Sequence, residues 1–206
     1  MKSLILNSEM VRAVLENRKT MHRVPVKPMG VLDGPSCMGY VWNPDGQIKG
    51  PPIAYCDDLE KLVKEQCPLG KVGDKLWVKE PWIISTCIES LNKENEGKQT
   101  ILYRATKPGY LPDSVKWKST VTMPQWASRI KLEITDIRVE KIQDISEEDA
   151  EAEGVDFMRH YPDSDPSFKA KMLFEGLWDS VYEKKGYGWD TNCYVWVREF
   201  KKMNGL

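Results

Sequence analysis

The chain has 206 residues, 41% of them hydrophobic and 30% charged, which is ordinary for one soluble globular domain. Its 30 basic and 31 acidic residues leave a net charge of −1, so nucleic-acid binding would need a local basic patch. No apolar run approaches the ~20 residues of a membrane span. The five cysteines are widely spaced without a C-x-x-C pair, which predicts reduced thiols, a cytoplasmic protein and no zinc site.

The first part of the chain predicts a strand, a helix and a second strand. Residues 4–6 form an apolar lead-in, and Ser8 can cap a helix that runs to about Glu16. Asn17 suits a left-handed helix end. Residues 20–25 alternate and predict a strand. Where this helix and strand meet, the sequence places three cations, Arg18, Lys19 and Arg23. They indicate either a functional site or a solvated basic turn.

Residues 29–70 differ from the rest because Gly and Pro punctuate them, which predicts an irregular insertion over one face of the core. Short strands at 39–42 and 53–55 are expected there as a hairpin. Further strands are predicted at 75–82 and 100–105.

The stretch 123–155 is the most informative part of the sequence. Apolar and polar residues alternate over 128–139, which predicts a half-buried strand, and the alternation slips at Thr135–Asp136, which predicts a β-bulge. A serine with a carboxylate three residues later then fits a capping box for a short helix over 146–153. Gly154 lies where that helix should end.

Glu153 is electrostatically out of place in this short helix. It lies in the last turn, where the helix dipole disfavours a negative charge and raises the pKa of a carboxyl group. A solvated surface glutamate is the plain alternative.

The C-terminal part predicts a helix from Pro166 to about Glu183 and a closing strand over 193–200. Several strands that are not adjacent in the chain, with few helices, predict an α+β fold. We expect one domain over residues 1–206, a mixed and mainly antiparallel β-barrel with flanking short helices and the inserted segment.

Four pieces of sequence carry a family resemblance. They are NRKT at 17–20 with Arg23, GDKLWVKE at 73–80, ISEEDAEAEG at 145–154 and VWVREF at 195–200. In order and spacing they resemble the ASCH domain, a PUA-like barrel. The MPQWASR run at 123–129 further resembles the longer ASCH proteins of phages and prophages. The resemblance implies a PUA-like barrel that binds RNA or a nucleoside.

The resemblance also implies catalytic residues. Some small ASCH members hydrolyse N4-acylated cytidines, and ribonuclease activity is described for others. Their catalytic Lys and Glu fall on Lys19 and Glu153, whereas their Thr falls on His22 and a usual Gly falls on Asn17. Lys19 would be the base, Glu153 the proton donor and His22 a proton relay, with no metal or cofactor. Alternatively, His22 only hydrogen-bonds a ligand or a carbonyl.

Lys19 can act as a base only if burial or neighbouring cations lower its pKa by ~3 units. Arg18 and Arg23 are the cations that we expect to do so.

Aromatic rings beside cations indicate a second function. Single-stranded nucleic acid needs cations for its phosphates and flat rings on which bases stack, each worth ~1–3 kcal/mol. For Trp77 and Trp196 we expect burial in the barrel interior instead. The candidate ligand-binding residues at or near strand ends are Lys79, Trp82, Tyr103, Arg104, Trp126 and Arg129.

The leading interpretation is therefore a nucleic-acid or modified-nucleoside binding protein of phage or prophage type. One alternative is a metal-independent hydrolase of N4-acylated cytidines, or a ribonuclease, that uses Lys19 and Glu153. Another is an interaction or regulatory protein with a vestigial cleft, whose segment 29–70 contacts a host protein.

Overall fold

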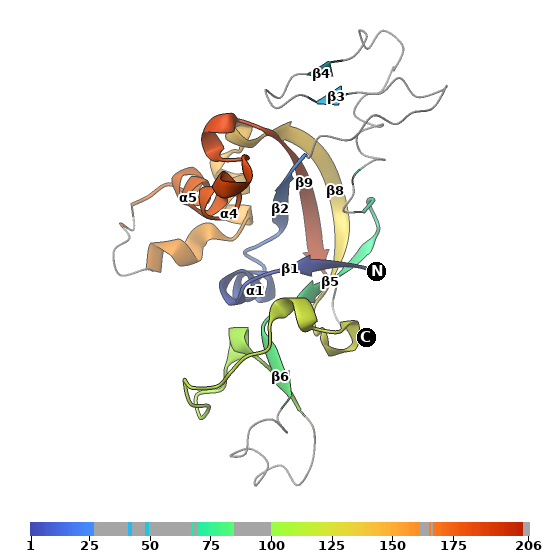
Figure 1. Cartoon of the computed structure of the whole chain (residues 1–206), viewed down its shortest axis with the longest axis vertical. Coiled ribbons are helices and arrows are strands. Elements are labelled where there is room, and N and C mark those ends of the chain that lie inside the picture. The colour runs from blue at the N-terminus through green and yellow to red at the C-terminus, as the bar shows by residue number, and fades with distance from the viewer. Residues whose placement is uncertain are drawn as a thin grey trace.

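The computed structural model describes residues 1–26, 41–42, 48–49, 67, 70–84, 100–160, 165 and 167–203. Its main feature is a five-stranded mixed sheet in the order β1-β5-β8-β9-β2 (Figure 1). Strand β1 pairs with β5 in parallel, and the other three pairings are antiparallel. The strands are β1 (Lys2–Ile5), β2 (Met21–Pro25), β5 (Lys75–Lys79), β8 (Lys131–Lys141) and β9 (Tyr194–Lys202).

The fold is thus α+β, as the sequence predicts. Within the described part of the chain the strand order ends at β1 and β2, and these two strands do not pair with each other. Closure of the sheet into a PUA-like barrel stays a prediction.

The long strand β8 confirms the alternating pattern in the sequence. It begins and ends slightly later than predicted, and its register with β9 shifts between Ile134 and Asp136, so the predicted bulge is present. Ile134 and Ile137 are three positions apart and would face opposite sides of a regular strand. Because of the bulge, both are buried in the same core.

The helices follow from local signals, with one correction. Helix α1 (Ser8–Leu15) is capped by Asn7, whose side chain accepts from the Met10 backbone N–H at 2.8 Å, so Ser8 is the first helical residue and not the cap. Asn17 has the predicted left-handed conformation, with φ 58°. Helix α5 (Ala170–Tyr182) begins later than predicted.

Helix α4 (Glu147–Ala152) makes only half of the predicted capping box. The Ser146 hydroxyl accepts from the Asp149 N–H at 3.0 Å, as predicted. The Asp149 carboxylate instead accepts from Arg23 and Arg138, so a tertiary contact replaces the local one. Gly154, with φ 78°, ends the helix.

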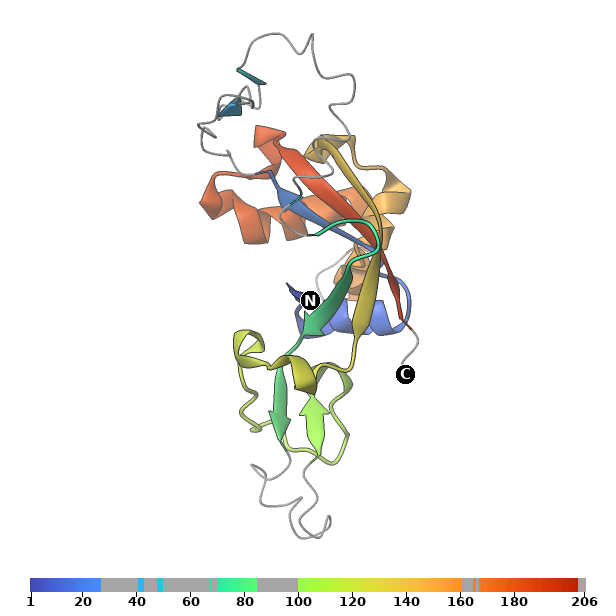
Figure 2. The ribbon, with the colours of Figure 1, turned by 90° about the vertical axis from the view of Figure 1, so that its right-hand side faces the viewer.

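The predicted strand at 75–82 is two strands. Pro81 follows β5, and β6 (Trp82–Ile84) then pairs with β7 (Ile101–Tyr103) in a separate two-stranded sheet. This β6–β7 unit lies at one end of the long axis, away from α4 and α5 (Figure 2). The strand predicted over 100–105 ends at Tyr103, and residues 104–106 form a 3-10 turn.

In the predicted insertion 29–70, residues 41–42, 48–49, 67 and 70 are described. Residues 41–42 and 48–49 form the short strands β3 (Val41–Trp42) and β4 (Ile48–Lys49), which pair antiparallel. The predicted strand 53–55 lies outside the described residues, as does most of the segment proposed to meet a host protein.

Both faces of the main sheet are covered, and β9 shows this by its alternation. Trp196 and Phe200 pack in the apolar cluster that contains Val11 of α1. Val195 and Val197 pack in the cluster formed with α4 and α5. Side chains in the middle of β9, and those of β2 beside them, therefore face one core or the other. For this reason the polar residues Arg23 on β2 and Arg198 on β9 are buried.

Candidate functional site

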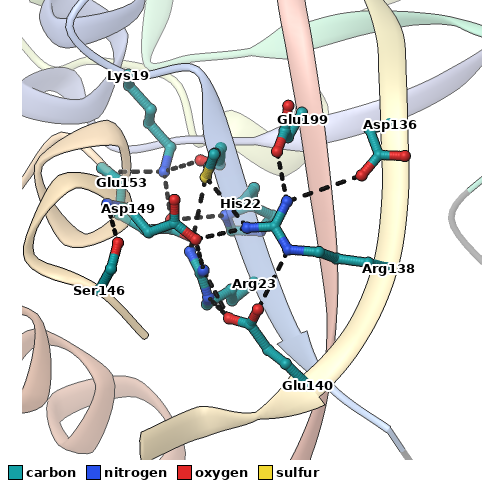
Figure 3. A network of polar contacts seen from close by, with 11 residues as sticks. Lys19, His22, Arg23, Asp136, Arg138, Glu140, Ser146, Asp149, Glu153 and Glu199 are labelled. Atoms are coloured by element: carbon teal, nitrogen blue, oxygen red, sulfur yellow. Dashed lines mark hydrogen bonds and ion pairs between the residues drawn. The ribbon is translucent and has the colours of Figure 1, made fainter. Parts of the chain in front are cut away.

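A buried ion pair connects the segment before β2 to the end of α4 (Figure 3). The Lys19 Nζ atom donates to Glu153 Oε2 at 2.8 Å, and the two side chains are 0% and 4% exposed. Nζ also donates to the carbonyl oxygens of Glu153 and Met21, at 2.8 Å and 2.7 Å. The interpretation of Glu153 as a solvated glutamate is wrong, and all three N–H groups of the ammonium have acceptors.

Two backbone features bring Lys19 to this position. The left-handed turn at Asn17 lets the Arg18 and Lys19 N–H groups both donate to the Ala13 carbonyl at the end of α1. Gly154 leaves room for the lysine, since a Cβ atom at that position would lie 2.9 Å from the Lys19 Cβ. The close approach of the two segments therefore requires glycine.

Arg23 joins the ion pair to a wider network (Figure 3). Its Nη1 atom donates to Glu153 Oε1 at 3.2 Å, and its Nη2 atom donates to Glu140 Oε1 and Asp149 Oδ2, each at 2.6 Å. Arg138 on β8 binds Glu140, Asp149 and Glu199. We did not predict Arg138, Glu140, Asp149 or Glu199 as part of the site. The sequence signal was present, because charges at 136, 138 and 140 share one face of a strand.

The electrostatics of the pair differ from the sequence-based expectation. Burial raises the pKa of Glu153, but the charges of Lys19 and Arg23 outweigh burial and hold it below its usual value. The upward shift that we expected from the helix dipole is wrong, because nearby cations outweigh that dipole. Burial lowers the pKa of Lys19, Glu153 opposes this, and Arg23 and Arg198 add to the lowering.

His22 is the most accessible of the three predicted catalytic residues. Its Nδ1 atom lies 4.0 Å from Glu153 Oε2, and its side chain is 19% exposed. Burial, followed by the charge of Lys19, lowers the pKa of His22 to about 3, so the ring is neutral. Arg18 lies outside this group, because its 37% exposed side chain pairs with Glu16 and Asp156. We call Lys19, His22, Arg23 and Glu153 the Lys19 cluster.

The remaining predicted residues gather at the β6–β7 unit. Three cations lie over rings: Lys79 over Trp77 at 5.1 Å, Lys118 over Trp82 at 5.0 Å and Arg129 over Tyr103 at 4.1 Å. Arg129 also binds the buried Glu80 carboxylate through two hydrogen bonds of 2.9 Å. Sequence reasoning missed Lys118, which the isolated bridge between Trp82 and Lys118 brings to this surface.

The tryptophans divide by exposure. Trp77 and Trp196 are buried, as expected. Trp82 is only 5% exposed, so its predicted role in stacking a ligand is wrong: Met123 and Ala127 pack against it. Trp126 is 69% exposed and meets Trp82 edge-on, with 6.2 Å between ring centroids. Arg104 is exposed in the turn after β7.

The predicted site residues therefore fall into two groups and not into one cleft. The Lys19 cluster lies between β2 and α4, and the second group lies at the far β6–β7 end (Figures 1 and 2). The described residues contain no group of three or more His, Cys, Asp or Glu that could hold a metal ion. None of the described helices is long and apolar enough to cross a membrane.

No protein-family model matches this sequence, and it has no significant match among curated proteins or solved structures.

Proposed function

We propose that this protein is an ASCH-type, PUA-like protein that binds single-stranded nucleic acid, and that the binding surface lies on the β6–β7 unit. The surface consists of Lys79, Arg104, Lys118, Trp126 and Arg129, and we call it the Trp126 surface. The observation that carries the proposal is the exposure of Trp126, whose ring contacts Trp82, the ring over which Lys118 lies.

An indole ring that is 69% exposed has an apolar face in water, and a stacked base would cover it. The Trp126 ring meets that of the buried Trp82 at an interplanar angle of 87°, a contact that positions the indole while most of it stays exposed. Lys118 is exposed and lies over Trp82, the ring that Trp126 contacts, so its ammonium group can reach a phosphate beside a stacked base. A sequence-independent contact of this kind fits a chain whose net charge is −1.

The test is the change in tryptophan fluorescence when single-stranded RNA or DNA oligonucleotides are added to wild type and variants. Trp126→Ala should weaken binding by about 1–3 kcal/mol, the value of one stacked base. Phe168→Ala is the matched control, because it removes an exposed ring before α5, far from this surface, and should leave affinity unchanged. Equal affinity for wild type and Trp126→Ala, or no binding of either strand type, would contradict the proposal.

The geometry of the Lys19 cluster favours a second candidate, hydrolysis of an acylated exocyclic amine on a nucleobase. The favouring observation is the 2.8 Å contact of Lys19 with Glu153, with His22 beside it. The pKa directions reverse the roles that the sequence suggested. Glu153 is ionised and suits the base, and Lys19, whose pKa is lowered by burial, suits the acid.

In this mechanism Glu153 takes a proton from water while the oxygen of that water adds to the acyl carbon. The C–N bond then breaks, and Lys19 gives a proton to the leaving nitrogen. The proton on Glu153 returns to Lys19, and the products are a carboxylic acid and the free amine. Incubation with N4-acylated cytidines, followed by chromatography, tests this candidate. Glu153→Gln should abolish turnover, and the absence of turnover by wild type on every substrate would reject hydrolysis.

A further inference from the structure

Arg198 is a buried cation that lacks a counter-ion among the described residues. It is 2% exposed, and its Nε atom is buried without a hydrogen-bond partner. The neighbouring buried or half-buried cations differ, since Lys19, Arg23 and Arg138 each contact a carboxylate. The described part of the chain places no carboxylate oxygen within 4.0 Å of the Arg198 guanidinium.

The sheet fixes where this cation lies. Arg198 is on the same face of β9 as Trp196 and Phe200, which pack with α1, and on the opposite face from Val195 and Val197. Its Cα partner on β2 is His22 and its partner on β8 is Ile137. Arg198 therefore lies between the apolar Ile137 of β8 and the accessible side of the Lys19 cluster, where His22 reaches solvent.

Burial removes the water that would solvate a guanidinium group, and only an anion or several acceptors can replace it. His22 beside it can contribute one ring N–H. Lys19 can contribute charge but no hydrogen bond, because its three N–H groups already have acceptors. Among the described residues, the group thus has an unused donor at Arg198 Nε and a guanidinium charge that no carboxylate contacts.

We propose that Arg198 and His22 form a binding site for an oxyanion, the phosphate or carboxylate group of a small ligand. A guanidinium group offers two parallel N–H donors that match two oxygens of such a group. The site is separate from the Trp126 surface. It requires neither nucleic-acid binding nor hydrolysis, so its failure leaves both of those proposals standing.

The experiment is calorimetric titration of the full chain with inorganic phosphate, cytidine 5′-monophosphate, acetate and uncharged cytidine, at constant ionic strength set with chloride. Wild type should bind at least one of the anions saturably. Saturation by phosphate and the nucleotide assigns a phosphorylated ligand, and saturation by acetate assigns a carboxylate. Saturation by cytidine alone would contradict the proposal.

Arg198→Met keeps an unbranched, apolar stem out to about the position of Nε and removes the guanidinium group. It should weaken anion binding about tenfold to a hundredfold, the range for a hydrogen bond to a charged group. Without anion its unfolding temperature should equal or exceed that of wild type, because an unmatched buried charge is gone. Lys184→Gln is the control, since it removes an exposed positive charge just beyond α5 and should leave binding unchanged.

An arginine with a purely structural role predicts a different outcome. Arg198→Met would then unfold at a lower temperature, and wild type would bind no anion. If Arg198→Met does not fold, Arg198→Lys distinguishes a structural role from anion binding. It keeps the charge but loses the paired donors, so it should bind the anion more weakly than wild type and still show a rise in unfolding temperature with anion. Equal affinity of wild type and either variant overturns the proposal.

Discussion

At the scale of single residues, Lys19 has a larger structural role than a lysine at a strand edge. Its side chain is 0% exposed and its ammonium neutralises Glu153. Lys19→Met would leave that carboxylate in the interior with only Arg23, at 3.2 Å, as its ion-pair partner. We expect a loss of about 3–5 kcal/mol in the free energy of unfolding, measured with urea.

The double variant Lys19→Met/Glu153→Gln is the control for this prediction, because it removes both charges. It should recover part of the lost stability. Wild-type stability of the single variant would mean that Arg23 alone satisfies Glu153.

The lowered pKa of His22 predicts how the free energy of unfolding depends on pH. Its pKa is about 3 in the folded protein and 6.5 when unperturbed, so the unfolded chain binds a proton that the folded chain does not between these values. The free energy of unfolding should therefore fall as pH drops from 6.5 toward 3, by at most about 1.4 kcal/mol per pH unit.

The measurement is urea unfolding of wild type and His22→Gln between pH 4.5 and 6.5. This range lies above the unperturbed pKa of Glu153, whose lowered value makes stability fall mainly below pH 4.5. The variant should lose stability less steeply than wild type as pH falls. Identical slopes would show that His22 titrates normally in the folded protein.

At the scale of elements, the junction between α4 and the segment before β2 depends on Gly154. Gly154 and Gly186 have nearly the same φ, 78° and 80°, but a Cβ atom at Gly186 would meet nothing within 4 Å. Gly186→Ala should therefore cost only the left-handed strain, about 1–2 kcal/mol. Gly154→Ala should cost more, because its Cβ would lie 2.9 Å from that of Lys19. Equal urea midpoints for the two variants would show that the chain relieves this contact freely.

At the scale of the whole molecule, the Trp126 surface and the Lys19 cluster lie in different parts of the fold, so their functions should separate. Lys118→Gln removes one candidate phosphate contact and should reduce the slope of log affinity against log salt by about 0.7 for a single-stranded oligonucleotide. Arg198→Met should leave that slope unchanged, because Arg198 is distant from the β6–β7 unit. Fluorescence titrations at several salt concentrations give both slopes, and a shared effect would indicate one continuous binding surface.

The sequence by itself determined the features that near neighbours control. The bulge at Thr135–Asp136, the Ser146 cap, the left-handed Asn17 and the glycine end of α4 are set within a few residues, so their patterns were readable. The family resemblance selected Lys19 and Glu153, although it did not supply their protonation states.

Tertiary structure decided which charges and rings meet. Lys19 and Glu153 are separated by 134 positions in the sequence, and only the packing of α4 against the end of α1 brings them together. The pKa of Glu153 moved opposite to the local expectation because cations from other elements surround it. In the same way, Trp82 is buried and Trp126 exposed because β7 and the turns after it cover one ring and leave the other open. Local patterns fix backbone conformation, whereas long-range packing fixes the surroundings of a side chain, and its chemistry depends on those surroundings.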